Sequence, residues 1–331
     1  MSLPSQQVLR LGMGFVASQA LRVVAELGIA DLLGGGERTV DELARESGGN
    51  AESLYRVMRL LASEGVFRET SPRRFVQTEA SETLRSNRPQ SPRDFIRMIN
   101  SEPYEAFADL LHSVRTGETA FEHRFGAPRF DWLEAHPDKE TLFQRAMIAM
   151  SQGANEGLAE AFDFTPFKHV VDVGGGHGQL LSAILARNPH LSGVLFDRPS
   201  SIAMAKTGLG GPLPRTELLA GDFFQSVPEG ADVYVLKRVI HDWEDERAAT
   251  ILRNCRDAMN PSGTVLIAER ISAQGNDPDL NKYLDIVMLG VTGGVERTEQ
   301  EFGSLLANSG LRLERVIPAR AGMSFLQARA V

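Results

Sequence analysis

The sequence predicts an α/β protein with a mostly parallel, seven-stranded sheet in its second half and a smaller, largely helical region before it. From residue 169 onward, seven short apolar segments alternate with stretches of helical spacing, as in a parallel sheet with helices on both faces. The first segment, residues 169–173, runs into a glycine-rich turn and then a helix. Such a turn presents free backbone N–H groups to a small ligand. We therefore expect a nucleotide-type cofactor at the carboxyl ends of the strands.

The first hundred residues predict helices followed by a hairpin. Apolar side chains at three- and four-residue steps predict one amphipathic helix over residues 8–28. Thr39 and Glu42 form a capping-box pattern at the start of the next helix, and Asn50 is suited to cap a third. Residues 66–77 then predict two short strands joined by a turn. Two short helices followed by a hairpin are typical of a winged helix.

The middle and the end of the chain differ in their periodicity. Residues 101–165 predict a helical connector, with a stripe of Phe and Met that is typical of a core. Residues 166–331 contain the sheet. The candidate strands are residues 169–173, 193–197, 218–221, 232–236, 263–269, 311–316 and 324–328.

Composition narrows the class of protein. The chain has 331 residues, 42% of them hydrophobic and 24% charged, which is typical of a globular domain. A net charge of -8 argues against a nucleic-acid partner. The single cysteine, Cys255, excludes an intrachain disulfide and is expected in the core. No secretory signal is visible, and charges interrupt the apolar residues 8–33, so we expect a cytoplasmic enzyme without a membrane partner.

The spacing of the glycines distinguishes two classes of cofactor. A dinucleotide fingerprint, G-x-G-x-x-G, would require glycine at position 179, which is Gln. The run is instead Asp172-x-Gly174-x-Gly176-x-Gly178. It resembles the first motif of Rossmann-like methyltransferases that use S-adenosylmethionine (SAM). In that class the acid and the glycine backbone hold the amino-acid end of SAM; a glycine turn without a ligand is the alternative.

Acidic residues end the next two strands. Asp197 ends the second strand, where a carboxylate can accept hydrogen bonds from both ribose hydroxyls. Asp222 and Phe223 follow the third, where the acid can bind the adenine amino group and the ring can pack on the base. Turn residues and core phenylalanines are the alternatives for these positions.

His241, followed by Asp242 and Trp243, lies at the end of the fourth strand. Methyl transfer from a sulfonium to oxygen is an in-line displacement, for which a neutral hydroxyl is a poor nucleophile. A histidine with a pKa near 7 can remove the proton as attack proceeds. The reaction also removes the sulfonium charge, so positioning does most of the work. The alternative is an ordinary surface or core histidine.

The chain resembles the plant caffeate/flavonoid O-methyltransferase family and its bacterial relatives acting on aromatic secondary metabolites. The matching segments cover nearly the whole chain and comprise residues 21–33, 171–178, 196–199, 221–224, 237–243, 293–298 and 299–310. The resemblance implies a winged-helix dimerisation domain over residues 1–100, a connector that contributes to the acceptor pocket, and a Rossmann-like methyltransferase domain over residues 166–331. It also implies a homodimer, SAM as cofactor, S-adenosylhomocysteine as product and metal-independent O-methylation in antibiotic-type metabolism.

The resemblance implies roles for individual residues. His241 is the expected general base, with Glu269 and Glu296 flanking its imidazole. The residues expected to bind SAM are Ser151, Asp172, Gly174, Gly176, Asp197, Asp222, Phe223, Lys237 and Trp243. Those expected to line the acceptor pocket are Phe143, Met147, Arg238 and Met288. The plant enzymes have an aromatic residue in place of Arg238, so the arginine favours the bacterial branch and a larger or acidic aromatic acceptor.

Two other functions are compatible with parts of the sequence. Some bacterial relatives bind SAM but catalyse decarboxylation or hydroxylation. A winged helix is also found in DNA-binding regulators, but charges balance to zero on the expected recognition helix, residues 51–64. No His, Asp and Glu cluster resembles a Mg²⁺ site. We therefore expect a phenolic or enolic hydroxyl on a small aromatic molecule as the acceptor, and no nucleic acid.

Overall fold

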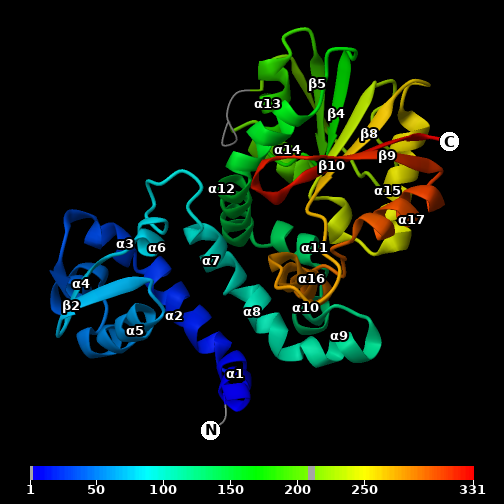
Figure 1. Cartoon of the computed structure of the whole chain (residues 1–331). Helices are drawn as coiled ribbons and strands as arrows, with labels where there is room; N and C mark the ends of the chain where they lie inside the picture. Colours follow the sequence, from blue (N-terminus) through cyan, green and yellow to red (C-terminus); the bar gives the residue numbers. More distant parts are fainter. Residues whose placement is uncertain (1–2, 208–212) are drawn as a thin grey trace. The chain divides into compact units, whose positions relative to one another are not determined.

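The computed structural model describes residues 3–207 and 213–331. The chain forms two compact units. Met1–Glu105 with Asp138–Met150 make the first, called here the N-terminal unit, and Ala106–Pro137 with Ser151–Val331 make the second, the sheet unit. The long helix α12 (Pro137–Ala161) therefore contributes residues to both units (Figure 1).

The N-terminal unit contains the expected winged-helix elements. A small antiparallel sheet has the strand order β1-β3-β2, and the buried side chains of α4 and α5 share one apolar core with Phe67 and Phe75 of that sheet. The capping box of Thr39 with Glu42 and the cap at Asn50 are both present. The bounds are α3 (Ile29–Leu32), β1 (Arg38–Thr39), α4 (Val40–Ser47), α5 (Ala51–Ser63), β2 (Phe67–Ser71), β3 (Arg74–Gln77), α6 (Glu79–Glu82), α7 (Arg93–Ile99) and α8 (Glu102–Ala106).

The prediction of one continuous helix over residues 8–28 is wrong. The segment is divided into α1 (Leu3–Gly12) and α2 (Gly14–Glu26), which are bent by 45°. Gly12 and Gly14 flank the break, and glycine in a helix interior costs on the order of 1 kcal/mol relative to alanine. Among the described residues, no single helix is long and apolar enough to cross a membrane, although this bent pair passes the same test of length and composition.

The sheet unit contains all seven strands that the sequence predicts, in the order β6-β5-β4-β7-β8-β10-β9. The first five are parallel, and the last two are antiparallel to their neighbours. The bounds are β4 (His169–Val173), β5 (Ser192–Asp197), β6 (Thr216–Ala220), β7 (Val233–Lys237), β8 (Thr264–Glu269), β9 (Leu311–Pro318) and β10 (Ser324–Ala330). The short connection between β9 and β10 allows only an antiparallel pair.

Side chains on the two faces of the sheet enter two separate cores. In β7, Val233 and Val235 belong to one core, whereas Tyr234 and Leu236 belong to the other. Residues of α12, α13 (Gln179–Arg187) and α14 (Pro199–Ala205) complete the first core. Residues of α15 (Asp245–Ala258) and α17 (Glu299–Asn308) complete the second. The remaining helices of this unit are α9 (Leu110–Thr116), α10 (Ala120–Phe125), α11 (Arg129–Glu134) and α16 (Leu280–Val291).

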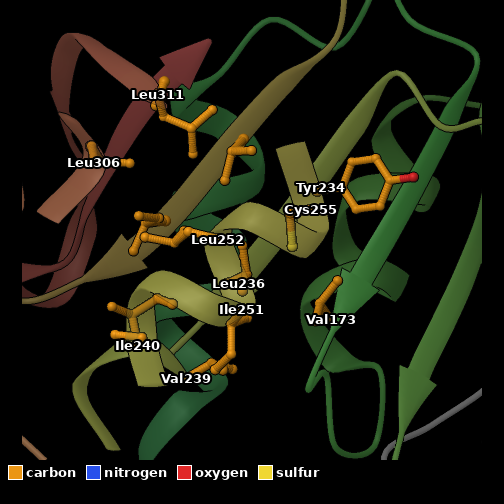
Figure 2. Close-up of a cluster of buried hydrophobic side chains, with 14 of the residues drawn as sticks. Val173, Tyr234, Leu236, Val239, Ile240, Ile251, Leu252, Cys255, Leu306 and Leu311 are labelled. Carbon is orange, nitrogen blue, oxygen red and sulfur yellow. The ribbon is translucent and has the colours of Figure 1, made fainter. Parts of the chain in front are cut away.

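Cys255 lies in the second of these cores, as the sequence predicts. Figure 2 shows it on α15, close to Tyr234 of β7, with Leu252 one turn away. Burial raises the pKa of the thiol far above its usual range, so the group stays protonated. Cys255 therefore acts as a small apolar side chain.

Shortening Leu252 tests this core. Leu252 is fully buried, so Leu252→Ala is expected to lower the free energy of unfolding by about 2–5 kcal/mol, because it leaves a cavity. The matched control is Leu280→Ala, since Leu280 is 62% exposed and its truncation should change stability by less than about 0.5 kcal/mol. Urea unfolding followed by circular dichroism measures both. Equal effects of the two substitutions would contradict the assignment of Leu252 to the core.

Candidate active site

The turn after β4 requires glycine at defined positions. Gly174 has φ +67°, and a Cβ there would lie 2.8 Å from a methyl group of Val239. Its backbone N–H donates to the Phe196 carbonyl at 2.8 Å. Gly178, with φ +71°, is the N-cap of α13. The turn therefore brings bare backbone to the start of this helix, as a small anionic or polar ligand needs.

Two carboxylates lie around this turn. Asp197, at the end of β5, accepts a 2.8 Å hydrogen bond from the Gly176 N–H. Burial raises the pKa of Asp197, although the N–H groups of Gly176 and Arg198 oppose the shift. Asp172 is 1% exposed, and neither of its oxygens has a hydrogen-bond partner in the described part of the chain. Burial raises the pKa of Asp172, and the Lys237 charge opposes this. An unpaired, buried carboxylate is suited to receive an amino group.

Lys237 ends β7 and donates to Asn155 Oδ1 at 2.7 Å. Burial lowers the pKa of Lys237, and Asp172 opposes the shift. Asn155 is a buried residue of α12 that sequence reasoning missed, because an Asn inside a helix of mixed composition gives no signal. Ser151, which we did expect here, lies four residues earlier and thus on the same face of the helix.

Aromatic side chains gather beside Asp222. One oxygen of the Asp222 carboxylate accepts a hydrogen bond from the Phe224 N–H at 2.9 Å. This oxygen therefore stabilises the turn, as expected if Asp222 is a turn residue. The Trp243 ring lies 6.1 Å from that of Phe223 and 4.8 Å from that of Phe224. The Arg247 guanidinium lies 4.3 Å from the ring centroids of Phe224 and Trp243. Such a cluster is suited to pack against a flat base.

His241 is buried, and a contact with Glu296 determines which tautomer its imidazole adopts. Its Nδ1 lies 2.7 Å from Glu296 Oε1, and both side chains are almost fully buried. A neutral imidazole that donates from Nδ1 has a lone pair at Nε2. The nearest carboxylate oxygen to Nε2 is Asp242 Oδ1, and their distance of 3.7 Å is too long for a hydrogen bond. The geometry leaves Nε2 ready to accept a proton.

Glu269 contacts His241 through the backbone: its Oε1 accepts the backbone N–H of His241 at 3.3 Å, so it holds the main chain. Glu269 reaches this backbone because it ends β8, directly beside β7, and therefore faces the turn that follows β7. The ring nitrogen Nδ1 is bonded to Glu296, and the expectation that Glu269 also flanks the imidazole stays a prediction. Burial raises the pKa of Glu269, against the opposing charge of His241.

The charges around His241 favour its protonated form. Burial and the Arg238 guanidinium lower the pKa of His241, but Glu269, Asp242 and Glu296 together raise it above its usual value. Burial raises the pKa of Glu296, but the hydrogen bond from His241 and the charges of His241, Arg238 and Arg270 together outweigh burial, and the net shift is downward. Glu296 therefore remains ionised beside the ring, where it can stabilise an imidazolium.

Arg297 ties the His241 segment to the loop after α16, a role that sequence reasoning missed. It is 1% exposed, and its guanidinium donates to the carbonyls of Ile240 at 3.1 Å and Trp243 at 2.9 Å. Its Nε and Nη2 also bind Asp245 Oδ1, at 2.9 and 2.7 Å. The only signal was its place in the Glu-Arg-Thr motif, residues 296–298.

Gly294 lies directly against the His241 backbone. A Cβ at Gly294 would lie 1.9 Å from the His241 carbonyl oxygen, a contact that no side chain can make. The next residue, Val295, donates its N–H to that same oxygen at 2.9 Å. The position of the histidine is thus fixed by backbone contacts as well as by Glu296.

The residues expected to line the acceptor pocket are divided between the two units. Arg238 and Met288 belong to the sheet unit, where Arg238 Nη2 lies 3.8 Å from Glu296 Oε1 and Met288 is buried on α16. Phe143 and Met147 lie on α12 in the N-terminal unit, and their role stays a prediction. Within the described ranges there is no group of three or more His, Cys, Asp or Glu residues that could hold a metal ion.

Family models match most of the chain. An O-methyltransferase domain matches residues 107–312, and an O-methyltransferase dimerisation domain matches residues 9–87. The chain belongs to the O-methyltransferase family. It is 43% identical to the phenazine O-methyltransferase PhzM of Lysobacter antibioticus, over 99% of this chain and 96% of that protein. The match confirms the family and the fold class that the sequence predicts.

Solved structures agree with the assignment. The crystal structure of LaPhzM has a TM-score of 0.91 and 42% identity over the full length of both chains. The O-methyltransferase NcsB1 from neocarzinostatin biosynthesis, in complex with S-adenosylhomocysteine and 1,4-dihydroxy-2-naphthoic acid, has a TM-score of 0.82 and 34% identity, over 95% of this chain and 96% of that one. This protein is a SAM-dependent O-methyltransferase, and the glycine turn with the bare oxygens of Asp172 fits its cofactor.

The contact at Gly294 can be tested with a matched pair of substitutions. Gly294→Ala is expected to lower kcat about 100-fold, because the His241 backbone must move by about 1 Å or more. The control is Gly303→Ala in α17, where an added Cβ meets nothing within 4 Å and should stabilise the helix by about 0.5–1 kcal/mol. Transfer of the labelled methyl group and urea unfolding measure both effects. A Gly294→Ala enzyme with wild-type kcat would contradict this geometry.

Proposed function

We propose that this O-methyltransferase uses His241 as a general base to methylate a phenolic or enolic hydroxyl of an aromatic secondary metabolite. The observation that carries the proposal is the pairing of His241 Nδ1 with Glu296 at 2.7 Å while Nε2 has no hydrogen bond in the described part of the chain. A base must be oriented and have a free lone pair, and this arrangement supplies both.

In the proposed reaction, residues of this chain accept one proton from the acceptor and release it. As the acceptor oxygen attacks, its proton passes to Nε2 of His241, and the imidazolium is stabilised by Glu296 and by the nearby charges of Asp242 and Glu269. SAM, when bound, supplies an electrophilic methyl group: the S–CH₃ bond breaks, the O–CH₃ bond forms, and S-adenosylhomocysteine leaves as a neutral thioether. His241 then returns the proton to solvent. This scheme needs no metal ion, because a side chain takes the proton.

The expected SAM site follows the ends of the strands. Asp172 is suited to the amino group, since its buried oxygens lack partners among the described residues, and Asp197 to the ribose hydroxyls. Phe223 and Trp243 are suited to pack on adenine, with Asp222 near its amino group. The remaining residues in this assignment are Ser151, Gly174, Gly176 and Lys237.

The proposed acceptor is a small aromatic molecule. Similar enzymes include a 3-amino-4-hydroxybenzoate 4-O-methyltransferase and a 2,7-dihydroxy-5-methyl-1-naphthoate 7-O-methyltransferase. Phe143, Met147, Met288 and Arg238 are the proposed lining. We also propose that the enzyme is a homodimer through its N-terminal domain, since Val8, Leu11 and Phe15 of α1 and α2 are exposed there. That domain is further proposed to contribute to the partner's active site.

The direct test is to incubate the protein with labelled SAM and a panel of aromatic hydroxy compounds. A methyl ether formed together with S-adenosylhomocysteine supports the proposal. An oxygenated or decarboxylated product would instead favour the other chemistry, which has a precedent in a relative named aclacinomycin 10-hydroxylase RdmB, 35% identical over 90% of this chain. Nothing in the comparisons supports a DNA-binding regulator.

Replacing the base should remove chemistry without removing cofactor binding. His241→Gln is expected to lower kcat/KM about 10²–10⁴-fold, because glutamine cannot take the proton. Calorimetry should give a SAM affinity close to that of the wild type. The control is His169→Gln, since His169 lies at the opposite end of β4 and is exposed. Full methyl transfer by His241→Gln would show that another group is the base.

The pH dependence should follow His241. Because its pKa is raised and only the neutral ring accepts a proton, kcat/KM should fall as the pH drops through a value above 6.5. Glu296→Gln removes a carboxylate that raises this pKa, so the acidic limb should move to lower pH, while kcat falls about 10–100-fold. An acidic limb that stays in place, or moves to higher pH, would contradict the role of Glu296.

A further inference from the structure

Arg238 occupies a strained position directly after β7. Its φ is +54°, in the left-handed region that non-glycine residues seldom adopt and that costs on the order of 1 kcal/mol or more. A hydrogen bond from its backbone N–H to the Ala268 carbonyl, at 3.1 Å, fixes this conformation. Backbone strain of this kind persists where the surroundings enforce it, and here it lies three residues before the catalytic histidine.

The Arg238 guanidinium makes one long ion pair and no hydrogen bond in the described part of the chain. Its side chain is 26% exposed, and its nearest carboxylate oxygen is Glu296 Oε1 at 3.8 Å. That oxygen is already bonded to His241 Nδ1 at 2.7 Å. Within residues 3–207 and 213–331 the guanidinium makes no hydrogen bond. Arginine carries five N–H donors in a planar fork that fits a carboxylate in a bidentate manner, and all five remain unused here.

The charges near His241 would repel an anionic acceptor if Arg238 were absent. Asp242, Glu269 and Glu296 all raise the pKa of the His241 imidazole. The positive charge of Arg238 lowers the pKa of each of these three carboxyl groups. Two other cations lie at these strand ends: Lys237 already donates to Asn155, and Arg270 follows Glu269 and also acts on Glu296. The fork of Arg238 lies within 3.8 Å of the carboxylate that holds the proposed base, so an incoming anion would find a donor fork there.

We propose that Arg238 binds a carboxylate carried by the aromatic acceptor, so that the substrates of this enzyme are aromatic hydroxy acids. The inference rests on the proposed function, in which the acceptor hydroxyl lies at His241 Nε2. Glu296 Oε1 lies near both His241 and Arg238. A single aromatic acceptor can therefore present its hydroxyl to His241 and its carboxylate to Arg238. A bidentate pair would also fix which hydroxyl faces the base.

A structural role for Arg238 makes a different prediction. If the arginine served only to balance Glu296 or to adjust the basicity of His241, its loss would affect acidic and neutral acceptors alike. The acid-to-ester ratio therefore discriminates between the two roles. The probes are 1,4-dihydroxy-2-naphthoic acid and its methyl ester, in which one methyl group removes the negative charge of the carboxylate.

The first measurement is binding, which does not depend on turnover. Calorimetry with S-adenosylhomocysteine present is expected to give at least about 10-fold tighter binding of the acid than of the ester. In Arg238→Gln the two affinities should agree within about twofold, and Arg238→Lys should retain part of the preference. The control Arg187→Gln removes one positive charge at the far end of α13, where Arg187 pairs with Glu160, and should keep the full preference. A wild-type enzyme without preference, or an Arg238→Gln enzyme that keeps it, overturns the proposal.

Methyl transfer to the same two probes separates this inference from the function on which it rests. If the ester is methylated as efficiently as the acid, the O-methyltransferase mechanism stands and the assignment of Arg238 is wrong. If Arg238→Gln lowers kcat/KM for both probes equally and shifts the pH profile, Arg238 acts through His241, which also overturns it. A binding preference that Arg238→Gln abolishes, without methylation of either probe, supports Arg238 as the anion site and counts against the proposed chemistry.

Discussion

The buried guanidinium of Arg297 holds together the two segments that form the candidate active site around His241. It reaches the carbonyls on both sides of His241, at Ile240 and Trp243, and it follows Glu296 in the chain. One residue thus fixes the main chain of His241, the proposed base, and the position of Glu296, which is bonded to its ring. A buried arginine is expensive to desolvate unless all its donors are matched, and here carbonyls and Asp245 match them. The close contact between the backbones of Gly294 and His241 also fixes the position of His241.

The sheet explains why residues far apart in sequence meet. Strands β7 and β8 run parallel, and Lys237 pairs in register with Ala268, so the residues that follow both strands emerge at the same edge. This brings Glu269 to the His241 backbone and Arg238 to Ala268. The ends of β4 and β5 place Asp172 and Asp197 along that edge. The order of the strands therefore separates the proposed cofactor site, near the glycine turn, from the proposed acid–base site, near His241.

Sequence reasoning predicted the features that depend on local pattern. Seven strands were recognisable from their apolar composition. The glycine turn and the helix caps could be predicted because each of these structures requires a particular residue type. The helix break at Met13 was missed, because the periodicity of residues 8–28 continues through it and two single glycines are weak signals. Asn155 and the backbone role of Glu269 were missed for another reason. Both depend on which atoms meet in three dimensions, and periodicity carries no information on that.

The shared oxygen of Glu296 links two equilibria. Oε1 faces the His241 ring at 2.7 Å and the Arg238 guanidinium at 3.8 Å, so the negative charge that favours the imidazolium is partly offset by the arginine. Anything that neutralises Arg238 increases the proton affinity of His241. By thermodynamic reciprocity, protonation of His241 must strengthen the binding of an anion at Arg238 by the same factor. In the proposed mode of binding, one coupling free energy therefore changes both the proton affinity of His241 and the affinity of Arg238 for the acceptor carboxylate.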